Sequence, residues 1–113
     1  MFNENFSHGK KFTFNSDNLP FTTLDEVVKE NGNKVITVRE VFINHKAKFG
    51  ARPCLVCDTL KINLPNHFVA DIQKILENQE YIDAINSGHC GFQPTQYQDK
   101  NGVVRNSGKF VDI

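Results

Sequence analysis

The sequence has no excess of charge of either sign and no long hydrophobic run. Its 113 residues include 13 basic and 13 acidic side chains, so any affinity for a polyanion has to come from where the charges lie. No apolar stretch approaches the ~20 residues of a membrane span, and the polar start "MFNENFSHGKK" lacks the apolar segment of a secretory signal. These features predict a single cytoplasmic domain, residues 1–113, that does not interact with membranes.

Cysteine is scarce, and motifs for nucleophilic catalysis, zinc-dependent hydrolysis and phosphate binding are absent. The sequence has no Gly-rich phosphate loop, no G-x-S-x-G and no H-E-x-x-H. We therefore expect no enzymatic activity, no catalytic residue, no metal and no cofactor. Three cysteines are an odd number in a chain without an export signal, which favours reduced thiols over a disulfide framework.

The stretch "RPCLVCD" nevertheless holds Cys54 and Cys57 at the C-x-x-C spacing of zinc sites and redox centres. The intervening Leu55 and Val56 are strand formers and poor turn formers. In a strand, residues three apart point to opposite faces, so the two thiols cannot easily bind one metal. Metal binding and redox chemistry are minor alternatives, and the sequence predicts that Cys54, Cys57 and Cys90 are packing residues.

The first half of the chain combines strand patterns with one short helix. Residues 1–20 are expected to form an N-terminal strand or arm. Thr23 and Glu26 have the spacing of a capping box, which predicts a short helix that ends at Asn31–Gly32. β-Branched and aromatic residues then predict a long, bent strand at residues 34–44 and one or two strands within residues 54–64.

The hydrophobic period changes after Pro65. Apolar residues recur at helical spacing through residues 66–86, which predicts a helix with an interruption near Asn78. Ser87–Gly88 is expected to end it. Strand patterns follow at residues 90–98 and 109–113, and residues 99–108 are expected to form the loop between them.

This order of elements predicts an OB-fold, a mainly β, five-stranded, partly open Greek-key barrel. The main helix of that fold lies between the third and fourth strands, which is where the sequence places residues 66–86. The short N-terminal helix precedes the first barrel strand. The alternative is an α+β sheet packed on one helix.

The charges are balanced overall but not locally. Residues 34–61 hold six basic and two acidic side chains, whereas residues 62–99, which include the predicted helix, hold one basic and five acidic ones. Residues 100–113 are basic again, with three cations and one carboxylate. In an OB-fold, the two loops that flank the ligand groove would be residues 44–52 and 98–109, and both contain several cations.

Cationic and aromatic side chains in and near these loops are the candidate binding residues. Cations that follow phosphates and aromatic rings that stack on bases are what single-stranded nucleic-acid binding requires. Simple solvation is the commoner role of loop cations, and Phe42, Phe92 and Phe110 are expected in the core. The candidates are Lys46, Lys48, Phe49 and Arg52 in the first loop, Tyr97, Lys100, Arg105 and Lys109 in and beside the second, and Arg39 and Lys61 on strands.

A resemblance to a known group of proteins is carried by "FINHKAKFGARP", "INLPNHFVADIQKIL" and "IDAINSGHCGF", together with Tyr97 and the closing "FVDI". These stretches are similar to small single-stranded DNA-binding proteins encoded by phages of Gram-positive bacteria, of the lactococcal and streptococcal type. The likeness runs over most of the chain from about Lys34 onward. None of its motifs is a catalytic signature.

The resemblance implies an OB-fold protein that coats single-stranded DNA during phage DNA replication or recombination in the cytoplasm of the host cell. It implies a homodimer or higher homo-oligomer, with replication or recombination proteins as further partners. The residues that match the group best are Lys46, Lys48 and Phe49, followed by Arg52 and Tyr97, and then by Lys100, Arg105 and Lys109.

A second hypothesis is a small protein-interaction module. The helical region carries Asp71, Glu77, Glu80 and Asp83, which would form an acidic docking face for a protein partner. Solvation is the commoner explanation of such charges. The hypotheses differ in one simple respect, because only the first predicts salt-sensitive binding of single-stranded DNA.

Overall fold

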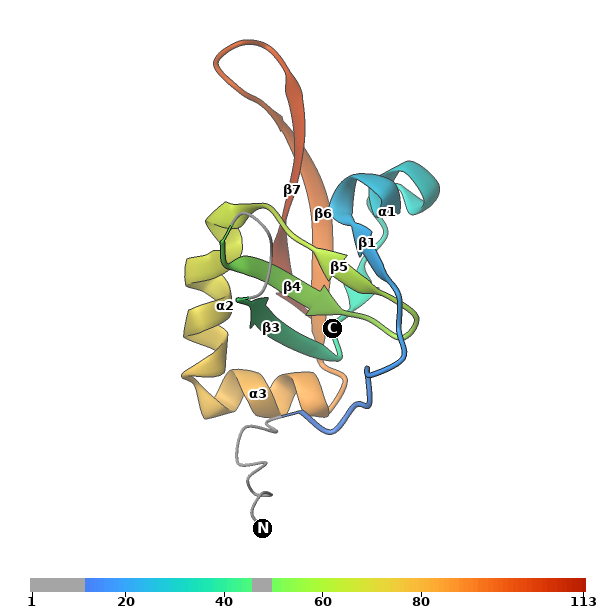
Figure 1. Ribbon diagram of the computed structural model, residues 1–113, viewed down its shortest axis with the longest axis vertical. Helices are drawn as coiled ribbons and strands as arrows, with labels where there is room; N and C mark the ends of the chain where they lie inside the picture. The colour runs from blue at the N-terminus through green and yellow to red at the C-terminus, as the bar shows by residue number, and fades with distance from the viewer. Residues whose placement is uncertain (1–11, 46–49) are drawn as a thin grey trace.

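The computed structural model describes residues 12–45 and 50–113 and arranges them as two sheets with three helices (Figure 1). One sheet has the strand order β1-β5-β4-β3, and the other has the order β2-β6-β7. β1 and β5 are parallel, whereas the other neighbouring strands are antiparallel. The elements are β1 (Phe21–Thr23), α1 (Leu24–Asn31), β2 (Ile36–Thr37), β3 (Glu40–Asn44), β4 (Arg52–Val56), β5 (Lys61–Asn63), the 3₁₀ turn η1 (Asn66–Phe68), α2 (Val69–Leu76), α3 (Gln79–Asn86), β6 (Cys90–Gln98) and β7 (Val104–Asp112).

A single stretch of chain, residues 36–44, belongs to both sheets. β2 pairs with β6, and the backbone N–H of Val38 then donates to the carbonyl oxygen of Cys90 at 2.9 Å. The next residue, Arg39, donates to the carbonyl oxygen of Val56 at 2.7 Å, after which β3 pairs with β4. The long, bent strand that the sequence predicts is therefore present as two short strands, with the change of sheet between them.

The helix boundaries follow the predicted capping signals. Thr23 precedes α1, and its hydroxyl oxygen accepts a hydrogen bond from the backbone N–H of Glu26 at 3.2 Å. The predicted helix of residues 66–86 is divided at Asn78, whose side-chain oxygen accepts from the backbone N–H of Glu80 at 2.9 Å and so begins α3. Both the capping residue and the interruption are confirmed.

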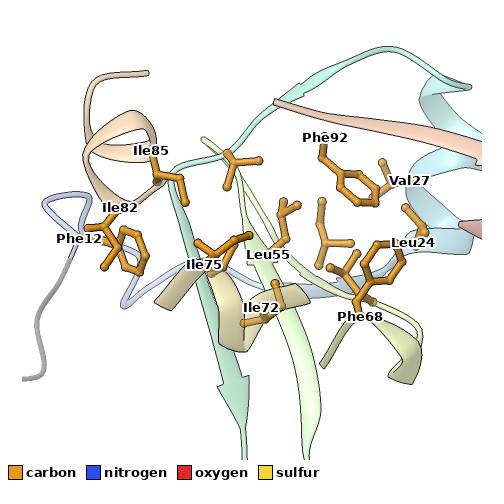
Figure 2. Packing of buried hydrophobic residues seen from close by; sticks show 14 residues of the cluster. Phe12, Leu24, Val27, Leu55, Phe68, Ile72, Ile75, Ile82, Ile85 and Phe92 are labelled. Atoms are coloured by element: carbon orange, nitrogen blue, oxygen red, sulfur yellow. The ribbon is translucent and has the colours of Figure 1, made fainter. Parts of the chain in front are cut away.

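One hydrophobic core joins the two sheets to the helices (Figure 2). Leu55 of β4 and Phe92 of β6 are fully buried in it, so both sheets contribute to the same core. Burial of such a side chain contributes about 1.5–3 kcal/mol to folding. The helices add residues at the predicted helical spacing, namely Leu24 and Val27 from α1, Ile72 and Ile75 from α2, and Ile82 and Ile85 from α3.

The described residues form a mixed α/β fold with seven strands and three helices, where the sequence predicts a mainly β domain of five strands. Within residues 12–45 and 50–113, the two sheets do not close into a barrel. Two of the extra elements come from divisions of predicted ones, because the bent strand gives β2 and β3 and the main helix gives α2 and α3. The other is β1, which pairs in parallel with β5 about 40 residues later, and such a long-range pairing leaves no local pattern.

The hairpin of β6 and β7 projects from the rest of the molecule and has nine residues in each strand (Figure 1). The predicted loop of residues 99–108 is too long, because β7 begins at Val104 and the connection is confined to residues 99–103. β7 pairs with β6 along its whole length, and this pairing overrides the turn propensity of the Asn, Ser and Gly residues in the segment.

The described part of the N-terminal segment, residues 12–20, packs against the rest of the molecule in an irregular conformation. The ring of Phe12 is buried and lies beside Ile82 of α3 (Figure 2). The hydroxyl of Ser16 donates to the carboxylate of Glu40 on β3 at 2.9 Å. Residues 1–11, which make up the rest of the predicted strand or arm, lie outside the described residues.

Gly108 on β7 leaves no room for a side chain, and this close approach gives a first prediction. A Cβ atom at this position would lie 2.4 Å from a ring carbon of Phe92 and 2.8 Å from the backbone oxygen of Gln93. Neither neighbour can move away freely, because one belongs to the buried core and the other to the backbone. We expect Gly108→Ala to lower the free energy of unfolding by about 1–3 kcal/mol, measured by chemical denaturation.

Gly91→Ala is the matched control, because Gly91 also lies in the β6–β7 hairpin. The atoms nearest a Cβ at this position are methyl groups of Val35, Ile113 and Val111, at 2.7, 2.9 and 3.3 Å. Val35 and Ile113 are nearly half exposed and can change rotamer. The loss at Gly91 should therefore be the smaller one, and equal losses at the two glycines would contradict the proposed cause.

Candidate nucleic-acid interface

A cleft of about 520 Å³ lies against the outer half of the β6–β7 hairpin, and we call it the hairpin cleft. Its walls come from parts of the chain that are far apart in sequence: the start of α1, the start of β4, the end of β5, and the hairpin. Polar and charged side chains line it together with a tyrosine. These lining residues are Thr23, Asp25, Arg52, Asn63, Tyr97, Arg105 and Asn106.

Three of the predicted binding residues meet in the hairpin cleft. Arg52 begins β4, whereas Tyr97 and Arg105 stand opposite each other in the register of β6 and β7. The sequence places Arg52 and the other two in separate loops, and the fold brings them to one site. The ring of Tyr97 is 48% exposed and the side chain of Arg105 is 57% exposed, so both are accessible to a ligand.

The guanidinium of Arg105 is held by an acidic neighbour at the hairpin turn. Its Nε donates to Oδ2 of Asp99 at 3.0 Å. The other carboxylate oxygen of Asp99 accepts the backbone N–H groups of Asn101 and Val103. The hydrogen bond from Arg105, followed by that from Val103, lowers the pKa of Asp99 below its usual value, so this carboxylate is charged at neutral pH. The ion pair orients Arg105 and leaves its terminal nitrogens to other acceptors.

The four-stranded sheet has a second, polar and aromatic side. Because side chains alternate along a strand, Val41, Leu55 and Ile62 share the core side, where all three are buried. The residues of opposite parity point to the other side of the sheet, which we call the outward face. It is defined here by Phe21, Phe42, Arg52, Lys61 and Asn63. Cys54 and Val56 of β4 are fully buried there, whereas the residues around them are at least partly exposed. Arg52 and Asn63 also line the hairpin cleft, so the outward face and the cleft are continuous.

Aromatic rings and a cation lie together on the outward face. The Nζ atom of Lys61 is 5.1 Å from the ring centroid of Phe21, and Phe21 is 50% exposed. The ring of Phe42 meets that of Phe21 edge to face, with 6.5 Å between centroids. Phe42 is expected in the core from the sequence, and Phe21 is not among the predicted binding residues. The alternation of residues along β3 does not indicate that Phe42 points outward, because apolar residues occur on both faces of this strand.

The remaining predicted binding residues lie elsewhere or outside the described residues. Lys46, Lys48 and Phe49 lie outside the described residues. Arg39 is engaged by Asp58, with 2.6 Å between Nε and Oδ1. Lys100 is exposed at the hairpin turn. Lys109 lines a different cleft, of about 440 Å³, between β7 and helices α2 and α3.

The cysteines occupy packing positions. Cys54 is fully buried in β4, and its thiol lies 3.2 Å from Oδ1 of Asn63. Burial raises the pKa of Cys54 to about 11, and burial together with the nearby Asp112 raises the pKa of Cys90 to about 11. Cys57 follows β4 and is partly buried. Across the described residues, no three His, Cys, Asp or Glu side chains are grouped so that they could hold a metal ion.

Comparison with known proteins found no protein-family model, no curated protein and no solved structure that matches the chain. In the described part of the chain, no helix has the length and apolar character needed to cross a membrane. The function is therefore inferred from the hairpin cleft and the outward face, and the resemblance to phage proteins stays a hypothesis.

The raised pKa values of Cys54 and Cys90 lead to a prediction about alkylation. We expect Cys54 and Cys90 to react slowly with iodoacetamide in the native protein, because the thiolate is the nucleophile and a pKa of about 11 leaves roughly one thiol in a thousand ionised at pH 8. Their rates should rise about tenfold per pH unit between pH 8 and pH 10. Peptide mapping by mass spectrometry follows each cysteine separately.

The same digest contains its own controls for this prediction. Cys57 is more accessible than Cys54 and should be modified first. In urea all three cysteines should react at similar rates, since burial is lost. Equal rates for Cys54 in the native and the unfolded protein would contradict its burial.

Proposed function

We propose that this protein binds single-stranded DNA through the hairpin cleft and the outward face, without catalysis and largely independently of base sequence. The observation that carries the proposal is the convergence of Arg52, Tyr97 and Arg105 on one cleft. Two guanidinium groups beside an accessible aromatic ring match the chemistry of a nucleotide chain, in which phosphates alternate with bases.

The strand pairings support an OB-like arrangement as the basis of this site. β2 and β3 together correspond to the first OB strand, β4 to the second, β5 to the third, β6 to the fourth and β7 to the fifth, and α2–α3 lie between the third and fourth. The first strand pairs with the second and the fourth, the second with the third, and the fourth with the fifth. In this assignment β1 pairs with the third strand and leaves the barrel open.

This assignment also places the candidate site where OB-folds bind their ligands. The second and third strands and the connection between the fourth and fifth strands form the oligonucleotide-binding side of an OB-fold. The outward face includes β4 and β5, and the hairpin cleft is bounded by the ends of β6 and β7 next to their turn. The geometry of the site and the inferred fold therefore agree.

Each side chain would have a separate role in binding. The ring of Tyr97 would stack on one base, and a stacked base contributes about 1–3 kcal/mol. Arg52 and Arg105 would contact the phosphates on either side of that base. Along the outward face, Lys61 and the half-exposed ring of Phe21 would continue the same alternation of cation and aromatic group. None of these contacts reads a base edge, which explains the proposed lack of sequence selectivity.

The resemblance to phage single-stranded DNA-binding proteins suggests the biological setting of this activity. We propose that the protein coats single-stranded DNA during phage replication or recombination, in the cytoplasm of the host cell. A homodimer or higher homo-oligomer and contacts with replication or recombination proteins belong to the same proposal. Lys46, Lys48 and Phe49 lie outside the described residues and are proposed as further contacts on the resemblance alone.

Tyr97→Ala tests the stacking role. We expect this change to weaken binding of a labelled oligo-dT by about 5- to 150-fold, because one stacked base is lost. Fluorescence anisotropy measures the affinity, since the chain has no Trp of its own. Tyr81→Ala is the matched control, because Tyr81 on α3 is exposed to a similar extent, at 51%, and lies outside the hairpin cleft. If both variants bind like the wild type, the ring of Tyr97 does not stack on DNA.

Arg52→Ala tests the phosphate contact through the salt dependence of binding. The slope of log affinity against log salt concentration should become shallower by about 0.7, because one phosphate contact in a single strand is lost. Lys74→Ala removes a cation from α2 on another part of the surface and should leave the slope unchanged. A weaker affinity with an unchanged slope would show that Arg52 acts through packing.

Competition by duplex DNA and by RNA in the same assay defines the ligand. The proposal predicts that single-stranded DNA competes better than duplex DNA. A folded wild-type protein that binds no oligo-dT at low salt would overturn the proposal. That result would direct the search to a protein partner and to the exposed acidic residues of α2, α3 and the connection between them, which are Asp71, Glu77, Glu80 and Asp83.

A further inference from the structure

A chain of side-chain hydrogen bonds ties the β6–β7 hairpin to α1. The amides of Asn33 and Gln96 exchange two hydrogen bonds, each 2.8 Å long, in which each side chain donates once and accepts once. Nε2 of Gln96 also donates to Oδ1 of Asn106 at 3.1 Å, and Nδ2 of Asn106 donates to Oδ1 of Asp25 at 2.8 Å. We call these four residues the amide clamp. Gln93 adds a bond from its side chain to the backbone oxygen of Asn33.

The two sides of the amide clamp differ in how firmly they are held. α1 is anchored, because Leu24 and Val27 are buried in the core and β1, which leads directly into it, pairs with β5. The outer half of the hairpin projects from the rest of the molecule (Figure 1). The clamp therefore connects a projecting element to a fixed one, and it does so close to the hairpin cleft.

The register of the hairpin relates the amide clamp to the proposed binding residues. Gln96 is paired with Asn106, and the next pair toward the turn is Tyr97 with Arg105. Successive pairs in a sheet direct their side chains to opposite faces. Asn106 nevertheless lines the hairpin cleft together with Tyr97 and Arg105, as does Asp25 of α1, so the bond between Asn106 and Asp25 lies at the edge of the site itself. The clamp fixes the rotation of the hairpin one residue pair away from the site.

We infer that Asn33 and Gln96 are positioning residues for the binding site, an inference that rests on the proposed function. The amide clamp holds the hairpin so that Tyr97 and Arg105 stay on the same cleft as Arg52, which belongs to the other sheet. Neither Asn33 nor Gln96 lines the hairpin cleft, so their effect on binding is indirect. Without the clamp, the hairpin samples orientations in which the stacking ring and the cations no longer face one nucleotide chain, and binding has to select the correct one.

The test is the affinity of Asn33→Ala and of Gln96→Ala for labelled oligo-dT. We expect each variant to bind about 3- to 10-fold more weakly, with a melting temperature close to that of the wild type, because the lost bonds are on the surface. Gln98→Ala is the matched control, since it removes the same side chain from the same strand at an exposed position outside the amide clamp. It should bind like the wild type. Wild-type affinity in Asn33→Ala would overturn the inference.

A double-mutant cycle with Tyr97→Ala separates positioning from a general effect on structure. If the amide clamp positions Tyr97, the loss caused by Tyr97→Ala should be several-fold smaller in the Asn33→Ala background than in the wild type. Independent losses that multiply would overturn the inference, because Asn33 and Tyr97 would then affect binding separately. A wild type that does not bind oligo-dT would overturn the proposed function as well. Binding that depends on Tyr97 but not on Asn33 would overturn only the positioning role.

Discussion

The change of sheet between Val38 and Arg39 is the constraint on which the rest of the structure depends. Two consecutive backbone N–H groups donate to different sheets, one to Cys90 of β6 and the next to Val56 of β4. The side chain of Val38 is completely buried at this corner, so the bend is held by packing as well as by hydrogen bonds. Neither sheet can rotate against the other without breaking one of these bonds and exposing the core.

This corner explains how a site can be built from residues of both sheets. Arg52 and Asn63 belong to the four-stranded sheet, whereas Tyr97 and Arg105 belong to the hairpin of the three-stranded one. Their relative placement is set first by the corner, then by the shared core around Phe92, and last by hydrogen bonds between the hairpin and α1. Each step acts over a shorter range than the one before it. The hairpin tip is farthest from the corner and depends most on the last step.

Because side chains alternate along its strands, the four-stranded sheet has two chemically different sides. The same strands that bury Leu55 and Ile62 present Lys61 and Phe21 on the outward face. An exposed aromatic ring is unfavourable in water, and the ammonium group above Phe21 offsets part of that cost by about 0.5–1 kcal/mol. The proposed binding of an aromatic, negatively charged ligand to this surface requires no change in the core.

Local signals in the sequence are sufficient for most of the elements, but not for β1, for the start of β7 or for all of the pairings between strands. Thr23 and Asn78 fix helix starts through bonds to residues two or three positions away, so their patterns are readable directly. The strand at residues 104–108 was missed because its Asn, Ser and Gly residues favour turns, and only the pairing with β6 makes it a strand. The convergence of Arg52 with Tyr97 was accessible because it needed only the order of the strands. The outward position of Phe21 cannot be predicted from the order of the strands, since it depends on the parallel pairing of β1.

The absence of net charge has a physical consequence for how such a site works. The cleft holds carboxylates as well as cations, because Asp25 lines it and Asp99 is bonded to Arg105 beside it. A carboxylate that orients an arginine lowers the entropy lost when a phosphate arrives, but it also reduces the local positive potential. Long-range attraction of DNA is then weak, and affinity has to come from short-range contacts. Short-range contacts require correct geometry, so a neutral protein that binds a polyanion depends more on the position of its hairpin than a strongly basic one would.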